Sequence, residues 1–499
     1  MSKSKKSIEE FDLFSASLGT TSRQTIISLL EQKEKLQQKN QQLLDESQEI
    51  HKKQDFVEES LPENQTYSKI ISKELFKFSP KIRHWFKLLS KFISFEIMIQ
   101  AINIGSGVLI VRSLHKEEYA YFVLANAMQS TINTLADSGI GSALSAIGGR
   151  VWQDQYRFGQ LIITAMHLRR YLALVAALVV MPILYLMLVQ NGASTSYTIL
   201  LMLTVFIEIY FYLDMGVLIV VPRLQSDVEF IQRSSLISSG LRILLLIGWN
   251  LSSILNALTG AISSAIASGV QNLIFWSHAK ENIDMKASVS HEDKVEILQI
   301  VKTIAPNTAF YCIQGQMTIW LISVFGNTQH IAEVGALGRL SVIFSLISSI
   351  MTNIILPSFS RSQSYEVLLL KYKQIIFGYL FLSLMILLIA INFPKQLLQI
   401  LGESYSSLER ELLFSMVAAI TSAVTSMLWS VNASKGWTEQ SWLFIPTIII
   451  TQIILLLSLD LSSVVGVSIF STLSVIPASC INFYMTYKGL LKTRTLYSL

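Results

Sequence analysis

The stretch YLALVAALVVMPILYLMLVQ, residues 171–190, carries no charged side chain. A helix of this length is about 30 Å long, which matches the hydrocarbon core of a bilayer. The turn residues Asn191 and Gly192 follow it directly, and another apolar run begins at Tyr197. This part of the sequence therefore predicts two helices that cross a membrane one after the other.

Further segments of about 20 mostly apolar residues bring the predicted number of spans to about twelve. The predicted spans are residues 88–111, 119–144, 171–190, 197–221, 236–255, 258–276, 300–325, 331–356, 372–393, 412–432, 442–459 and 464–487. A charged stretch, residues 280–296, separates the first six spans from the last six. We expect an all-α polytopic membrane protein with two six-helix lobes, residues 87–278 and 298–499, joined by a cytoplasmic loop over residues 279–297.

The distribution of Lys and Arg over the loops tests this count, because one missed span would invert the side of every later loop. One side receives most cationic loop residues, namely Arg150, Arg157, Arg169, Arg170, Arg223, Arg233, Lys280, Lys286, Lys294, Lys302, Arg361, Lys371, Lys373, Lys435, Lys488, Lys492 and Arg494. The opposite side receives Arg112, Lys116, Lys395 and Arg410. Since the cationic side is normally cytoplasmic, both termini are predicted to be cytoplasmic and the span number even.

The composition excludes several classes of protein. Hydrophobic residues make up 51% and charged residues 15% of the chain, against about 25% charged residues in soluble domains. No predicted loop is long enough for a catalytic domain, so we expect neither an enzyme nor a bound cofactor. The net charge of +5 gives no indication of nucleic-acid binding. The two cysteines, Cys312 and Cys480, lie in apolar stretches and suggest neither a disulfide framework nor a metal site.

The N-terminal segment, residues 1–86, differs from the rest in composition. Nearly two-fifths of all charged residues fall within residues 1–91, and no short apolar core that would mark a cleavable signal peptide follows the initiator. Within residues 23–61, apolar side chains recur at every seventh position: Leu29, Leu36, Leu43, Ile50 and Val57. The matching second seam is mostly polar, so this helix is either a coiled coil that pairs with itself or with a protein partner, or a solvated amphipathic helix.

A basic stretch, residues 67–87, leads into the first predicted span. Cationic and aromatic residues alternate there, namely Lys73, Phe76, Lys77, Phe78, Lys81, Trp85, Phe86 and Lys87. Such a segment is typical of a helix that lies on anionic inner-leaflet lipids. The same residues would also serve as ordinary cytoplasmic anchors of the first span.

The two halves of the chain contain a similar segment in the same position. Residues 115–150 and 329–361 both start with a short polar turn that carries a Glu, continue as a span rich in small residues, and end in Arg. Each segment covers the second span of its half. Duplicated halves with a substrate site between them are common in transporters, so this repeat favours transport over catalysis.

Four motifs occur in order along residues 88–487: SLHKEEYAYFVLA at 113–125, DSGIGSALSAIGGR at 137–150, PSFSR at 357–361 and GESYSSLERELL at 402–413. Together they resemble the polysaccharide (O-antigen type) flippases of the multidrug/oligosaccharidyl-lipid/polysaccharide exporter superfamily. The pair Tyr119–Ala120 stands where the family usually has Tyr-Gly. The heptad-bearing N-terminal segment is not part of the usual family pattern.

This resemblance implies a function and a location. Such flippases move an isoprenoid-pyrophosphate-linked oligosaccharide across the bacterial cytoplasmic membrane for surface or exo-polysaccharide assembly. They have two six-helix lobes around a polar, often cationic cavity that opens alternately to each side. Coupling to H⁺ or Na⁺ is a separate hypothesis, which rests on the intramembrane carboxylates. The alternative within the same superfamily is a drug or cation exporter, which needs critical carboxylates rather than paired arginines.

Ionisable residues at membrane depth are candidates for function, because each costs roughly 2.5–3.5 kcal/mol on insertion scales. Arg242 and Arg339 come from different halves, and a guanidinium suits paired phosphate oxygens, so we expect them to bind the pyrophosphate. They could instead form buried ion pairs. The candidates for ion coupling are the carboxylates Asp137, Glu208, Asp214 and Glu96. Among these, Asp137 could instead cap a helix end, and Glu96 could face the inner interface.

Amide side chains form a second group of candidates. Asn126, Gln129 and Asn133 are spaced three and four residues apart, which places them on one face of a helix that continues to Asp137. Gln314 in the seventh predicted span is a possible counterpart. We expect these residues to line a hydrated path for sugars; the alternative is hydrogen bonding between helices.

Overall fold

The computed structural model describes residues 80–225, 227–351, 355–362 and 364–497. By contacts the chain divides into Met1–Leu88 and Leu89–Leu499, and the following description concerns the second unit together with the start of its first helix. The predicted heptad helix at 23–61 and most of the basic stretch at 67–87 lie outside the described residues. For them the sequence predictions stand untested.

All regular elements of the described part are helices, which confirms the all-α class. The first half contains α4 (Pro80–Ser113), α5 (Lys116–Asp137), α6 (Ile140–Val151), α7 (Gln155–Gln190), α8 (Thr195–Leu218), α9 (Val220–Leu224), α10 (Val228–Leu251) and α11 (Ala257–Asn282). The second half begins with α12 (His291–Phe325), α13 (Thr328–Leu340), α14 (Ile343–Ile350) and α15 (Leu356–Arg361). It continues with α16 (Tyr365–Asn392), α17 (Pro394–Leu401), η2 (Glu403–Tyr405), α18 (Glu409–Ser434), η3 (Ser441–Leu443), α19 (Phe444–Ser458) and α20 (Val464–Tyr497).

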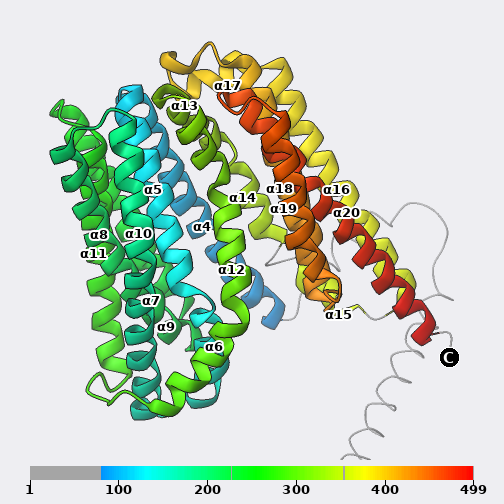
Figure 1. Ribbon diagram of the computed structural model, residues 1–499. Coiled ribbons are helices and arrows are strands. Elements are labelled where there is room, and N and C mark those ends of the chain that lie inside the picture. Colours follow the sequence, from blue (N-terminus) through cyan, green and yellow to red (C-terminus); the bar gives the residue numbers. More distant parts are fainter. Residues whose placement is uncertain (1–79, 226, 352–354, 363, 498–499) are drawn as a thin grey trace, which may run out of the picture. The chain divides into compact units, whose positions relative to one another are not determined.

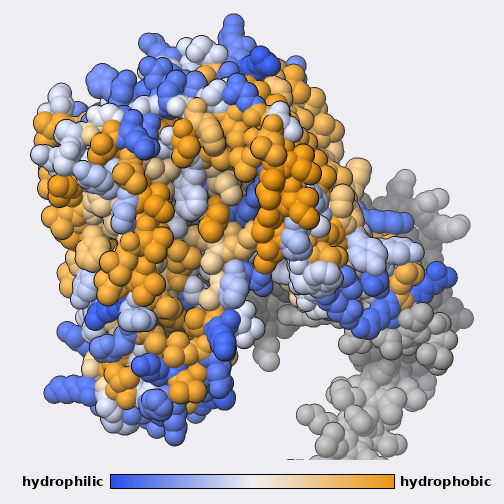
Figure 2. Space-filling model, in the orientation of Figure 1, coloured by the Kyte–Doolittle hydropathy of each residue, from blue (hydrophilic) through white to orange (hydrophobic). Residues whose placement is uncertain are grey.

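Nine helical segments of the described part are long and apolar enough to cross a membrane. Figure 2 shows a broad apolar band between polar ends. Large apolar side chains such as Leu178, Phe377 and Leu457 are more than 70% exposed. Exposing so large an apolar surface to water is unfavourable, so this band faces the hydrocarbon of a bilayer. The chain is therefore a multi-pass membrane protein.

Three of the twelve predicted spans are not among these nine segments: residues 119–144, 300–325 and 331–356. The first is interrupted where α5 ends, since Ser138 and Gly139 both have positive φ, and the third is divided into α13, α14 and α15. The second, within α12, carries several amide side chains. Helix α5 is almost entirely buried among other helices over its first half, so it does not need a lipid-facing apolar surface.

Helix α5 lies at the centre of a first helix group, α4–α11, and contacts α7, α8 and α11. Helices α8 and α11 pack closely, and the small residue Gly269 of α11 allows this, because the ring of Phe211 of α8 lies only 3.1 Å from where a Cβ would stand. Small residues allow helix backbones to approach in lipid, where van der Waals packing replaces the hydrophobic effect. This packing holds the faces of α5, α8, α10 and α11 in fixed positions.

A second helix group, α13–α20, is built mainly around α18 and α20, with α16 and α19 against them. Its centre holds a polar network that is 0–1% exposed: Asn432 Nδ2 donates to Asn482 Oδ1 at 3.1 Å, and Thr486 Oγ1 donates to Asn432 Oδ1 at 2.8 Å. Buried amides without partners are costly, so this network fixes how α18 and α20 pair.

We therefore expect Asn432→Ala to lower the free energy of unfolding by about 1–2 kcal/mol, because Asn482 loses the donor to its buried side-chain oxygen. Thermal unfolding of the purified protein in detergent measures this. Ser430→Ala is the control, since Ser430 lies half-buried on the same helix and donates to the carbonyl of Ser426 one turn earlier. Equal stability of both variants would contradict the role of the network.

Helix α12 runs between the two groups (Figure 1). Its first turns bond to the first group, where Asp293 pairs with Arg157 and Glu296 with Arg150. Further along, Gln314 bonds to α19 and Thr318 bonds to Ser471 of α20. Pro306 lies between these two parts of α12. Because proline has no backbone N–H, one hydrogen bond of the helix is missing there, which allows the helix to bend.

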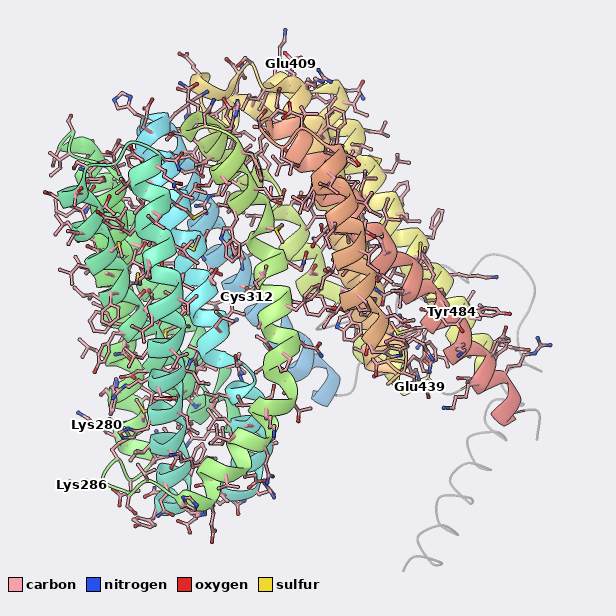
Figure 3. The ribbon with its side chains drawn as sticks, viewed as in Figure 1. Lys280, Lys286, Cys312, Glu409, Glu439 and Tyr484 are labelled. Atoms are coloured by element: carbon pink, nitrogen blue, oxygen red, sulfur yellow. The ribbon has the colours of Figure 1, made fainter. Side chains whose placement is uncertain are left out.

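The helices have two ends, which we call the Lys116 end and the Arg150 end after residues at each. Figure 3 shows Glu409 at the Lys116 end and Lys280 and Lys286 at the Arg150 end. At the Lys116 end, Lys116 of α5 forms a 2.8 Å ion pair with Glu333 of α13, and Thr328 Oγ1 donates to the carbonyl of Asn191. These contacts join the first helix group to the second.

Candidate functional site

A cavity of about 840 Å³ lies between α4, α5, α7, α8, α10 and α11 of the first helix group, and Thr308 of α12 also lines it. Most of its lining is polar. The amides are Asn103, Asn126, Gln129, Asn133 and Gln271, and the serines are Ser130, Ser235, Ser238, Ser239, Ser264 and Ser268. The charged residues are Asp137, Arg169, Glu208 and Arg242, and the apolar ones are Ile99, Met215, Ile219 and Ala267. Such a lining offers many hydrogen-bond donors and acceptors.

The predicted polar face of residues 126–137 lies on this cavity, since Asn126, Gln129, Asn133 and Asp137 all line it. Asn126 Nδ2 donates to the carbonyl of Phe122 at 2.7 Å, which orients its side-chain oxygen. The buried Oδ1 of Asn133 has no hydrogen-bond partner among the described residues. An unsatisfied buried acceptor is costly and is available for a donor from a ligand or water.

Arg242 on α10 also lines the cavity. Its buried Nε has no hydrogen-bond partner in the described part of the chain, and no carboxylate there lies within 4.0 Å of its guanidinium. Glu208 on α8 is close enough to attract it, and Arg339 is close enough to repel it. The charge of Arg242 is thus only partly compensated, and an anion in the cavity would stabilise it.

The predicted carboxylates differ in their surroundings. Glu208 is 7% exposed and lies within interaction range of Gln129, Ser268 and Arg242 inside the cavity. Asp214 does not line the cavity. Instead, Arg170 donates to both its oxygens at 3.0 and 2.6 Å. Glu96 accepts a bond from Gln100 at 3.2 Å on its own helix and does not line the cavity either.

Arg169 lines the cavity and was not singled out by the sequence, which placed it in a cationic loop. Helix α7 begins at Gln155, well before the predicted span at 171, and so carries Arg169 into the helix bundle. Its guanidinium lies 3.6 Å from Asp137 and occupies the space over Gly216, where an added Cβ would come within 2.0 Å of Nη1. No signal in the sequence links these three residues, because their contact exists only after α5, α7 and α8 pack.

Arg339 and Gln314 are not part of the cavity lining. Arg339 Nε donates to the hydroxyl of Tyr119 at 3.4 Å, and its side chain lies against Gly107 of α4. Gln314 forms a reciprocal amide pair with Gln452 at 3.0 and 2.5 Å, which joins α12 to α19. The helix-joining alternative therefore describes the observed contacts of Gln314.

Among the described residues, no group of three or more His, Cys, Asp or Glu is arranged to hold a metal ion. The amides, hydroxyls and charged groups of the cavity offer binding through hydrogen bonds and charge. Amides and hydroxyls suit a hydroxyl-rich ligand, and Arg242 suits an anionic group attached to it.

No family model matches the sequence, and no curated protein matches it. Solved structures do match the fold. An inward-facing multidrug resistance MATE family transporter of the MOP superfamily is 16% identical, with a TM-score of 0.65 over 80% of this chain and 96% of that one. An outward-facing structure of such a transporter has a TM-score of 0.57 at 16% identity, over 82% and 96% of the two chains.

The lipid II flippase MurJ in an inward closed conformation is similar to the same extent. It is 14% identical, with a TM-score of 0.64 over 81% of this chain and 89% of MurJ. All three are transport proteins rather than enzymes. The described part of the chain therefore shares the fold of MOP superfamily transporters, as the sequence resemblance predicted.

Proposed function

We propose that this protein is a flippase that moves an isoprenoid-pyrophosphate-linked oligosaccharide across the cytoplasmic membrane by alternating access. The observation that carries the proposal is the polar cavity with Arg242 at its wall and Arg339 close by. Sugars need many hydrogen-bond partners, which the amides and serines of the cavity supply. The pyrophosphate needs a cation that is not already neutralised, and Arg242, whose buried Nε has no hydrogen-bond partner among the described residues, meets that need.

Alternating access is supported by the distribution of contacts between the helix groups. At the Lys116 end, the groups are joined by the ion pair of Lys116 with Glu333 and by the hydrogen bond from Thr328 to the carbonyl of Asn191. The positive-inside pattern assigns the Arg150 end to the cytoplasm. In this proposal the conformation is closed to the outside, and loss of the contacts at the Lys116 end would accompany opening.

The location and energy source belong to the same proposal. We place the protein in a bacterial inner membrane with both termini cytoplasmic and with two six-helix lobes bounded near residues 87–278 and 298–499. Glu208 is the carboxylate best placed to couple H⁺ or Na⁺ to substrate movement, because it lies in the cavity beside Arg242. The helix that the sequence predicts at 23–61 would recruit a protein partner or pair with itself.

An exporter of drugs or cations is the second candidate, and the position of Glu208 favours it. A cationic drug would bind this carboxylate and would be repelled by Arg242 and Arg339. The two candidates thus predict opposite roles for the same residues. In an exporter, removal of Arg242 would leave transport intact or improve it.

Complementation of a strain that lacks its own glycan flippase tests the proposal. We expect the wild-type chain to restore surface glycan and Arg242→Gln to reduce it about tenfold to hundredfold at equal membrane levels, since a charge-assisted contact is lost. Arg233→Gln is the matched control, because Arg233 lies on the same helix but is 67% exposed and pairs with Glu229. Full activity of Arg242→Gln, or drug resistance that requires Glu208, would reject the flippase.

A further inference from the structure

A second cavity, of about 390 Å³, lies at the Arg150 end of the second helix group. It is formed where α18 ends, by the following turn and by the last part of α20. We call it the lysine pocket and define it by Lys435, Trp437, Glu439, Lys488 and Lys492. Figure 3 shows Glu439 and Tyr484 in this region, far from Glu409 at the other end. Neither the transport cavity nor the proposed pathway includes any of these residues.

The charge of the lysine pocket is unbalanced, with three lysines against Glu439. Lys435 Nζ donates to the carbonyl of Ser360 at 2.8 Å and also to that of Ser362, so its position is fixed by the backbone. Burial, together with the nearby cation Lys371, lowers the pKa of Lys435. An anion in the pocket would relieve this excess of positive charge.

The one carboxylate of the pocket is weakly held. Glu439 pairs with Lys492 at 3.1 Å, and both side chains are 68% exposed. The hydrogen bond from Lys492 lowers the pKa of Glu439, so this group is ionised and competes with any other anion. Exposed ion pairs of this kind contribute at most about 1 kcal/mol, so an external phosphate can replace Glu439 as the partner of Lys492.

The floor of the pocket depends on one glycine. The ring of Trp437 lies directly on Gly489, where an added Cβ would come within 2.1 Å of the ring carbon Cδ2. Met485, which is 1% exposed, also borders the pocket. Lys488 and Lys492 stand on the exposed rim above this apolar floor. A polar rim over an apolar floor suits a ligand that has a charged head and an apolar body.

Exposed aromatic side chains indicate the depth of the pocket in the membrane. Tyr484 is 47% exposed, Tyr487 is 62% exposed and Trp442 is 68% exposed, and all three lie close in sequence to the residues of the lysine pocket. Exposed Trp and Tyr concentrate at the headgroup level of bilayers. The pocket therefore opens where lipid phosphates lie.

We propose that the lysine pocket binds the phosphate of an anionic phospholipid headgroup in the leaflet at the Arg150 end, with Lys488 and Lys492 contacting the phosphate and Trp437 contacting the glycerol region. This site is distinct from the basic stretch at 67–87, which lies mostly outside the described residues. It does not depend on the transport proposal, because the same charge and depth would bind lipid in an exporter. Lipid bound here would hold the end of α20 against the turn after α18.

Native mass spectrometry of the full chain in detergent, titrated with short-chain phosphatidylglycerol, tests the site. We expect Lys488→Gln with Lys492→Gln to weaken binding about tenfold, since each lysine near a lipid surface contributes appreciably. The control is Lys280→Gln with Lys286→Gln, which removes the same charge from two exposed lysines at the same end (Figure 3). This control should bind within about twofold of the wild type, and Glu439→Gln should bind more tightly.

Phosphatidylcholine and inorganic phosphate complete the experiment. Phosphatidylcholine should compete poorly, because its headgroup has no net charge. Equal weakening by both lysine pairs would show a general surface effect and overturn the proposal. Displacement of the lipid by inorganic phosphate at similar concentration would assign the pocket to a soluble anion and overturn the lipid assignment.

Discussion

Arg157→Ala is expected to lower the free energy of unfolding by about 3–5 kcal/mol, a stability effect that we expect to exceed that of Asn432→Ala. Arg157 forms a two-bond pair with Asp293, one bond being 2.6 Å from Nη2 to Oδ1. The Asp293 side chain is 1% exposed, whereas that of Arg157 is 30% exposed. Removing the arginine therefore leaves a buried carboxylate without its cation, and the start of α12 detaches from α7.

A double-mutant cycle in thermal unfolding measures this effect. Arg150→Ala is the matched control, because Arg150 pairs with Glu296, which lies on α12 like Asp293. The side chains of this control pair are 64% and 42% exposed. We expect it to cost less than about 1 kcal/mol. Adding Asp293→Ala to Arg157→Ala should recover part of the lost stability, since it removes the unpaired charge. A double variant less stable than Arg157→Ala alone would contradict this account.

Lys116→Glu is expected to open the Lys116 end of the protein. The ion pair of Lys116 with Glu333 joins α5 to α13, the two side chains are 23% and 10% exposed, and Lys116 Nζ lies 5.4 Å from the centre of the Tyr405 ring. The change replaces attraction by repulsion in a half-buried place. A cost of about 2 kcal/mol, between surface and buried values, would shift the population of open molecules roughly thirtyfold.

Labelling of Ser323→Cys with a membrane-impermeant maleimide measures this opening. Ser323 is 8% exposed and bonds to Asn191 at the same end, so it becomes reactive only when the helix groups separate. The assay requires Cys312→Ala and Cys480→Ala to remove the native thiols. Adding Glu333→Lys to Lys116→Glu should restore protection. Lys395→Glu is the control, because its 4.0 Å contact with Glu409 is largely exposed. Equal labelling in all variants would contradict the proposed role of the Lys116–Glu333 pair in keeping this end closed.

Much of the candidate site followed from the sequence because helix periodicity acts over a few residues. The spacing of Asn126, Gln129 and Asn133 alone places them on one face, and the structure brings that face to a cavity. Because a charge in lipid is costly, the sequence likewise indicated Arg242 and Glu208 as candidate functional residues. The same argument marked Asp214 and Glu96 equally, although their partners are Arg170 and Gln100 rather than the cavity.

Helix lengths were less predictable for a related reason. The sequence treated Arg169 and Arg170 as loop cations, since charged residues rarely enter lipid. Helix α7 nevertheless includes both, because Asp137 and Asp214 from other helices compensate them. Only packing supplies these partners, so hydropathy ends a span too early wherever a charge faces the protein interior instead of lipid.

The sequence by itself determined that this is an all-α protein that crosses a membrane many times, because burying a helix in lipid requires about 20 apolar residues whatever its neighbours are. It also determined which residues could be functional candidates. The tertiary structure alone decided which candidates share a cavity, that Arg169 joins them, and that Arg339 and Gln314 do not line it. These decisions depend on contacts between helices far apart in the chain, and such contacts follow from the packing of whole faces rather than from any local pattern.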